Sequence, residues 1–302
     1  MIFINKDVRL KVVLLLLVVT INQSVAQKKA GVENSVFWEV SGNGLAQPSY
    51  LFGTFHLMSH RYADSLTQVS SRFAAAKTHV SEILLDSTMS GKMMTAAQLE
   101  GTTLDRLLTP EQFKQTNDWL QELSGYDLKM FNSINPMTIQ VLLTALLQQR
   151  HYPLDPIKDI AMDLYFQQRA AKEGKQLIGL ETFDDQIHAI FGQFTYERQA
   201  QLLVATVAEK DKALTELKSM NKLYREGRLT QLETLMADQV YTPKEAAVML
   251  DNRNKKWMQQ LPGIFRQQST FVAVGALHLA GENGLVMLLR NAGYTVKPLL
   301  TK

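Results

Sequence analysis

The sequence predicts an α/β protein in which a β-hairpin opens a small mixed central sheet and a large helical region flanks it. Aromatic and β-branched runs at 37–41 and 49–55 are typical of strands, and the Gly-Asn-Gly sequence at 42–44 between them is strong turn chemistry. A helical apolar pattern at 64–76 and a third strand-like run at 79–85 follow. A helix and a strand after a hairpin are typical of the start of an α/β unit.

The middle of the chain is predicted to be mostly helical, from about 92 to 172 and again from about 195 to 260. Thr109 before Pro110, with Gln112 at the capping-box position, is a clear helix start. The remaining elements are a strand at 176–180, a strand at 271–277, a helix at 285–291 and a strand at 294–296. The C-terminal strands are expected to join the hairpin in one sheet.

Two strands end in the same short pattern, a glycine followed three positions later by a histidine. Gly53 and His56 close the second strand, and Gly275 and His278 close the strand at 271–277. Glycine has no Cβ, so a backbone or a ligand can come close to it. Parallel neighbours in one sheet would bring both imidazoles, where strand gives way to loop, to the same edge. The sequence therefore predicts that His56 and His278 share one site.

The first 26 residues predict an export signal. Basic residues occupy positions 6, 9 and 11, an apolar run covers 12–21, and small residues at 24–26 fit a cleavage site. The apolar run is too short to cross a bilayer, which needs about 20 residues. We therefore expect a signal peptide at 1–26, a single domain at 27–302, a periplasmic or secreted location, and no stable membrane insertion after cleavage.

Composition limits the chemistry of the exported protein. The chain has no cysteine, so disulfide bonds and thiolate chemistry are excluded and the core must hold the fold. Its formal net charge of +3 falls to +1 when the signal, with three basic residues and one acid, is removed. A net charge this close to zero gives no electrostatic argument for nucleic-acid binding. The 46% hydrophobic content is enough for a sizeable core.

The residues at or near strand ends suggest a metal site. His56, Glu82, Glu181 and His278 supply two imidazoles and one or two carboxylates, which is the ligand set of hydrolytic zinc sites. Manganese, cobalt and non-haem iron fit these ligands equally well. A bound divalent ion polarises a carbonyl and makes water more acidic, and a second carboxylate could act as general base.

Structural roles compete with this hypothesis at each position. A single histidine after a strand is more often a capped loop residue than a ligand, although the repeated pattern favours a metal pair. Glu82 interrupts an apolar strand, and a buried carboxylate needs a partner. Glu181 could be a first-turn acid favoured by the helix dipole. The other four histidines lack the preceding glycine.

The chain resembles the TraB/GumN family, which includes the TIKI metalloproteases of animals. The resemblance rests on the stretches at 49–56, 179–182 and 271–279, on the strand that carries Glu82, and on Arg253-Asn254 with Trp257, and it spans about 36–299. It implies a fold similar to erythromycin-esterase-like and ChaN-like proteins, an α/β core with a helical cover. Met137 stands where the family usually has tryptophan after a proline.

The family resemblance also implies an activity and a set of site residues. It implies a divalent-metal peptidase or related hydrolase, with manganese or cobalt favoured and zinc an alternative. His56, Glu82 and His278 would be the metal ligands. Glu82 would also act in catalysis, with Glu181, Arg253 and Asn254 as supporting residues.

Two functions from different classes follow. The first is an exported metal-dependent hydrolase that acts on peptides or proteins. The second is a non-catalytic periplasmic factor that supports polysaccharide export or signalling. His56, Glu82 and His278 together favour the enzyme, because a binding module has no need of them. The sequence predicts no particular oligomeric state, substrate sequence or metal.

Overall fold

The computed structural model describes residues 34–56, 58–86, 88–155, 158–237 and 241–301. The chain divides into two units, Met1–Asn34 and Ser35–Lys302, and only Asn34 of the first unit is described. The predicted signal peptide at 1–26 and the first residues of the predicted domain at 27–302 therefore lie outside the described residues. In the described part, no helix is both long enough and apolar enough to span a membrane.

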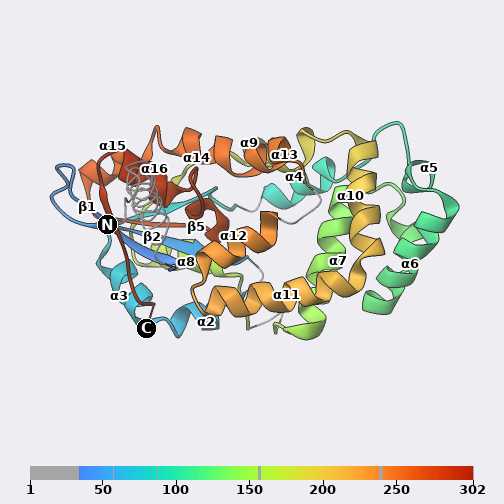
Figure 1. Cartoon of the computed structure of the whole chain (residues 1–302), viewed down its shortest axis with the longest axis horizontal. Coiled ribbons are helices and arrows are strands. Elements are labelled where there is room, and N and C mark those ends of the chain that lie inside the picture. The colour runs from blue at the N-terminus through green and yellow to red at the C-terminus, as the bar shows by residue number, and fades with distance from the viewer. Residues whose placement is uncertain (1–33, 57, 87, 156–157, 238–240, 302) are drawn as a thin grey trace, which may run out of the picture. The chain divides into compact units, whose positions relative to one another are not determined.

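A six-stranded mixed sheet lies at the left in Figure 1, with the long flanking helices to its right, and its strand order is β4-β3-β5-β2-β1-β6. Strands β4, β3, β5 and β2 are parallel neighbours, and β1 is antiparallel to both β2 and β6. The predicted α/β class, with a mixed sheet that a hairpin opens, is confirmed. The strands are β1 (Phe37–Ser41), β2 (Ser49–Thr54), β3 (Thr78–Ser81), β4 (Gln176–Gly179), β5 (Thr270–Gly275) and β6 (Thr295–Pro298).

The hairpin between β1 and β2 turns where the Gly-Asn-Gly sequence predicts. Gly42, Asn43 and Gly44 have φ angles of 77°, 47° and 79°. Glycine adopts this left-handed region without steric cost, and asparagine tolerates it better than most residues. The turn is closed by the amide of Leu45, which donates to the carbonyl of Gly42 at 3.0 Å.

Aromatic side chains fill the core on one face of the sheet. The Phe271 ring on β5 lies 6.1 Å from that of Phe52 on β2, 5.1 Å from Phe73 on α3 and 5.4 Å from Phe166 on α8. On the other face, the Arg290 guanidinium of α16 lies over the Trp38 ring. The helices that contribute buried side chains to the sheet core include α2 (His60–Asp64), α3 (Thr67–Ala75), α8 (Met162–Lys172), α12 (Leu229–Ala237), α14 (Asp251–Trp257), α15 (Leu261–Gln267), η3 (Ala276–Leu279) and α16 (Leu285–Asn291).

The remaining helices form the large flanking region, which has a hydrophobic cluster of its own. Thr109 caps α6 through the predicted capping box with Gln112. These elements are α4 (Met89–Ala96), α5 (Leu104–Leu107), α6 (Pro110–Ser124), η1 (Leu128–Phe131), α7 (Pro136–His151), α9 (Phe183–Ile187), η2 (His188–Gly192), α10 (Tyr196–Ala208), α11 (Lys210–Arg225) and α13 (Pro243–Met249).

The predicted strand at 79–85 is wrong at its C-terminal end, because β3 stops at Ser81. Ser81 is opposite Ala273 in the parallel β3–β5 pair, so a longer ladder would place a main-chain acceptor opposite the Gly275 amide. The Glu82 side chain takes that bond instead, with Oε1 accepting from the Gly275 N–H at 2.8 Å. The chain therefore leaves the sheet at Glu82.

His79 on β3 gives a pH dependence to the stability of the core. The ring is fully buried against Phe73 and Phe271, and burial lowers its pKa from 6.5 to about 4. Below pH 6.5 the unfolded state binds a proton that the folded state does not bind until about pH 4. Stability contributed by neutral His79 is therefore lost as the pH falls through this window, by about 3 kcal/mol in all.

We predict that His79→Phe makes the unfolding free energy less dependent on pH, since phenylalanine cannot take up the proton. Urea unfolding of both proteins between pH 6.5 and pH 4 measures this. The wild type should lose about 3 kcal/mol more than the variant across the window. Parallel pH profiles would contradict the assignment, whatever the absolute stability of the variant.

Candidate functional site

The C-terminal ends of four parallel strands meet at one edge of the sheet. His56 follows β2, Glu82 follows β3, Glu181 follows β4 and His278 follows β5. Because β2 and β5 are parallel neighbours, the two Gly-x-x-His patterns lie side by side. The edge beyond the carboxyl ends of parallel strands is where α/β proteins gather binding groups.

His56 is held by a carboxylate that the sequence analysis did not select. Its Nδ1 lies 2.7 Å from Oδ2 of Asp163, the second residue of α8, whose other oxygen accepts from the Thr54 hydroxyl. The Asp163 charge raises the pKa of His56. With Nδ1–H donated to Asp163, Nε2 is left to face the space between the strand ends. The His56 side chain is exposed, at 63%.

Glu82 is buried, and each of its oxygens has partners. Oε1 accepts from the Gly275 amide at 2.8 Å, and Oε2 accepts from Arg253 Nη2 at 2.6 Å and from Gln186 Nε2 at 3.2 Å. Burial by itself opposes ionisation, but the neighbouring imidazoles and Arg253 together hold the pKa of this carboxyl well below its ordinary value. Glu82 is therefore a fixed negative charge in a buried position.

His278 lies in the 3₁₀ turn η3 directly after β5, not in an open loop as the sequence predicts. Its Nδ1 is 2.7 Å from Oδ1 of Asn254, and Asn254 Nδ2 donates to the His278 carbonyl at 3.2 Å. The ring lies 4.4 Å from that of Trp257. Burial lowers the pKa of His278 to about 3, so the ring is neutral near pH 7, with Nδ1–H directed at Asn254.

Arg253 connects the carboxylates with His278. Its Nη2 lies 2.6 Å from both Glu82 Oε2 and Glu181 Oε1, and its Nε lies 3.1 Å from Glu181 Oε2. Its Nη1 lies 3.0 Å from His278 Nε2 and from the carbonyl of Met249. Glu181 is almost fully buried, and Trp257 Nε1 also donates to it. Glu181 thus binds Arg253, and Asn254 binds His278.

The two motif glycines have different structural roles. A Cβ on Gly53 would lie 2.8 Å from Cα of Ala276, so glycine there lets η3 pack onto β2. A Cβ on Gly275 would lie 3.3 Å from Glu82 Oε1, 3.5 Å from His56 Nε2 and 3.6 Å from His278 Cδ2. These three side chains therefore surround one point, which the missing Cβ keeps open.

The donor chemistry at this point suits a divalent cation. His56, Glu82 and His278 offer imidazole and carboxylate ligands, which zinc, manganese and cobalt all accept. With His278 neutral and His56 protonated, the three carboxylates Glu82, Glu181 and Asp163 against one guanidinium and one imidazolium give the cluster a net charge of −1. Among the described residues no three such side chains form a ready metal site, and Arg253 contacts His278 Nε2 instead.

A cavity of about 260 Å³ opens beside His56, Glu82 and Asp163. His56, Ser81, Glu82, Asp163, Gln167 and Gln186 form its polar lining, and Ile83, Leu85 and Ile190 form its apolar lining. Polar groups converging beside an aliphatic wall are typical of a site for a small molecule or for part of a larger one.

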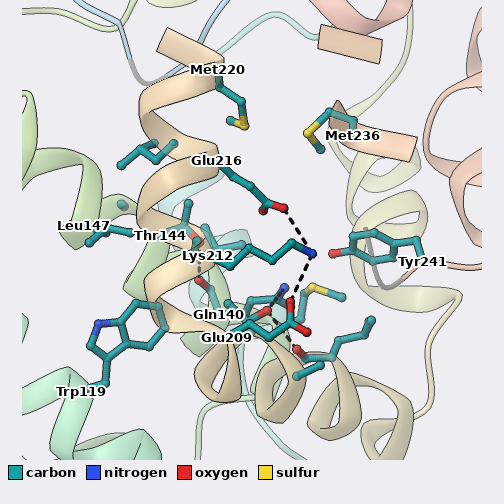
Figure 2. A pocket seen from close by; sticks show the side chains of 18 of the residues that line it. Trp119, Gln140, Thr144, Leu147, Glu209, Lys212, Glu216, Met220, Met236 and Tyr241 are labelled. Carbon is teal, nitrogen blue, oxygen red and sulfur yellow. Dashed lines mark hydrogen bonds and ion pairs between the residues drawn. The ribbon is translucent and has the colours of Figure 1, made fainter. Parts of the chain in front are cut away.

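A larger cavity of about 330 Å³ lies in the helical region between α7, α10 and α11. Figure 2 shows that Lys212 reaches between Glu209 and Glu216. Lys212 Nζ lies 3.2 Å from Glu209 and 3.5 Å from Glu216, and most of the lining is apolar. Its described lining contains no histidine and shares no residue with the smaller cavity. The chemistry of the strand ends is therefore associated with the smaller cavity.

The fold and the site define a mixed α/β protein with a histidine–carboxylate cluster at the carboxyl edge of its sheet. The model of the TraB/PrgY/gumN family matches residues 36–298, so the chain belongs to this family. The chain is also similar to the metalloprotease TIKI2 of Danio rerio, with 23% identity over 87% of this chain and 61% of that protein. It thus spans less than two thirds of this relative's length. No solved structure matches the chain.

Sequence reasoning missed Asp163 and Gln186, which contact His56 and Glu82. Asp163 lies in the first turn of α8, where an acid is favoured by the helix dipole alone, so its position carried no special signal. The structure brings together all six residues that the sequence and the resemblance selected. Their roles in catalysis and metal binding remain predictions.

We predict that Arg253→Met destabilises the protein by about 3 to 5 kcal/mol, because it leaves buried carboxylates without their cation. Lys256→Met is the matched control on the same helix, since Lys256 pairs with Asp185 at 2.6 Å in a half-exposed position. It should cost less than about 1 kcal/mol. Urea unfolding measures both.

Adding Glu181→Gln to Arg253→Met should recover part of the loss, because it removes one of the unpaired charges. Equal costs for the two single variants, or no recovery in the double variant, would contradict the view that Arg253 neutralises this cluster.

Proposed function

We propose that the protein is an exported, divalent-metal-dependent hydrolase that acts on peptides or proteins. The observation that carries the proposal is the meeting of His56 Nε2, Glu82 Oε1 and the His278 ring around the open point at Gly275. Membership of the TraB/PrgY/gumN family and the similarity to a metalloprotease support a hydrolytic reaction. His56 and Glu82 line the smaller cavity and His278 lies beside them, and a binding module has no need of such a set of imidazoles and a buried carboxylate.

His56, Glu82 and His278 would hold the ion, with manganese or cobalt favoured and zinc an alternative. When bound, such an ion supplies Lewis-acid chemistry, which polarises a carbonyl and makes water more acidic. His278 can offer Nε2 only after the Arg253 N–H moves away from it, because Nη1 lies at 3.0 Å in this structure. Metal binding through His278 would therefore require Arg253 Nη1 to give up this hydrogen bond.

The residues behind the ligands set their orientation. Asp163 accepts from Nδ1 of His56 and Asn254 accepts from Nδ1 of His278, so both rings direct Nε2 away from their support. Partners of this kind fix the tautomer and increase the basicity of a ligating histidine. The Gly275 amide and Gln186 fix Glu82, while Glu181 holds the Arg253 guanidinium beside it.

The proposal extends to location and fold family. The basic and apolar segments at 1–26 support export to the periplasm or the medium. The parallel strands with a helical cover support a likeness to erythromycin-esterase-like and ChaN-like proteins. The experiment that tests the activity is digestion of a peptide library by the purified protein, with and without a chelator, together with analysis of bound metal.

We predict that His56→Ala lowers chelator-sensitive peptide cleavage by at least about 100-fold and lowers bound metal, because a ligand is lost. The melting temperature should change little, since the side chain is exposed. His151→Ala is the control, because His151 is an exposed histidine at the end of α7. Cleavage at the wild-type rate by His56→Ala would overturn the metal hydrolase and favour a non-catalytic periplasmic role.

We predict a smaller effect for Asp163→Asn, about 10- to 100-fold in metal affinity, which is typical of a residue that orients a ligand. The amide keeps the shape of the side chain but removes the charge that holds the His56 Nδ1–H. Competition with a chelating dye measures the affinity without turnover. Unchanged affinity would show that Asp163 serves only the packing of α8 against β2.

A further inference from the structure

Ser81 is the last residue of β3 and has no evident structural purpose for its hydroxyl. It lines the smaller cavity and is 7% exposed, and its Oγ has no hydrogen-bond partner among the described residues. A buried hydroxyl without a partner lowers stability, and most buried polar groups in native proteins are paired. Alanine would fit this position in the strand without the stability cost of an unpaired hydroxyl. The presence of the hydroxyl therefore suggests a hydrogen-bond partner outside the chain.

The other polar side chains of the cavity are already engaged. Gln167 Nε2 donates to the Leu85 carbonyl at 2.8 Å, and Gln186 Nε2 donates to Glu82. Glu82 and Asp163 are acceptors, and Asp163 takes the His56 Nδ1–H. Among the described side chains that line the cavity, Ser81 is the one with a buried polar atom that has no hydrogen-bond partner. A carbonyl oxygen is the natural acceptor for it.

Ser81 is not placed as a nucleophile. A serine nucleophile needs a general base within hydrogen-bond reach of its oxygen. Neither imidazole of the site is a hydrogen-bond partner of Ser81 Oγ. A role in holding the substrate is consistent with this isolation, because such a hydrogen bond forms only when the substrate arrives.

The same segment also supplies an aliphatic wall. Ser81, Ile83 and Leu85 alternate along the chain and all line the cavity, and Ile190 of η2 adds a third aliphatic side chain. Leu85 is one of the exposed large apolar side chains of the protein. An aliphatic group of the substrate would cover it from water.

We infer that Ser81 and the aliphatic wall of Ile83, Leu85 and Ile190 form the subsite for the acyl part of the substrate. The hydroxyl donates to the carbonyl oxygen of an amide, and the wall takes the aliphatic side chain on the same residue. This inference rests on the proposed hydrolase for its meaning, but binding at the subsite can be measured without turnover. The substrate class is a peptide with a leucine-like residue at the acyl position.

The test is NMR titration of the purified protein with N-acetyl-leucinamide and N-acetyl-glycinamide. The wild type should bind the leucine probe more tightly than the glycine probe. Ser81→Ala should weaken binding of both probes by about 3- to 10-fold, the size of one hydrogen bond. Ser81→Thr keeps the hydroxyl and should restore most of the affinity. Leu85→Ala should reduce the preference for leucine and leave the glycine probe unaffected.

A matched serine separates binding from stability. Ser49 on β2 is also buried, but its hydroxyl oxygen accepts from the Thr270 amide at 3.1 Å. Ser49→Ala should lower the melting temperature and leave probe binding unchanged, whereas Ser81→Ala should leave the melting temperature unchanged or raise it. A drop in melting temperature for Ser81→Ala equal to that for Ser49→Ala would overturn the inference.

The remaining outcomes distinguish this inference from the proposed function. Wild-type affinity in Ser81→Ala, or failure of the wild type to bind either probe, overturns the subsite even if peptides are cleaved. Probe binding that depends on Ser81 in a protein that cleaves no peptide supports the subsite and contradicts the hydrolase.

Discussion

The charge of Arg253 is the constraint on which the site depends. A guanidinium has five N–H groups, and here all five are used. They reach Glu82, Glu181, His278 and the Met249 carbonyl, which lie after β3, after β4, after β5 and at the end of α13. Without the guanidinium, two buried carboxylates so close together would repel each other, and nothing would offset the hydration that they lose on burial. The position of α14 against the sheet edge is therefore set by electrostatics as well as by apolar packing.

The two imidazoles of the site differ in their burial and in their charge. His278 is buried beside Trp257 and neutral, and Asn254 holds it at both Nδ1 and the carbonyl. His56 is exposed, and the charge of Asp163 favours its protonated form. His278 therefore stays neutral in a fixed orientation, whereas the exposed His56 can exchange a proton with solvent. The two imidazoles of the site therefore differ in burial and in protonation state.

The sequence predicted those features that depend on local chemistry. The turn at 42–44, the cap at Thr109 and the two strand-end histidines follow from neighbours within a few residues. Asp163 could not be found in this way, because an acid in the first turn of a helix is ordinary and its contact with His56 is made only by the fold. The early end of β3 was equally hidden, since it depends on the Glu82 side chain replacing a main-chain acceptor.

The repeated Gly-x-x-His pattern predicted that His56 and His278 share one site, but its two glycines have different roles. Gly53 is needed because Ala276 of the second motif packs against it, so the first motif provides a surface for the second. Gly275 is needed because Glu82 and both histidines surround the space where its Cβ would lie. A larger residue at Gly53 would move η3 and therefore His278, whereas one at Gly275 would fill the space between Glu82 and the two histidines. The same motif thus sets the position of the site at one strand and its open volume at the other.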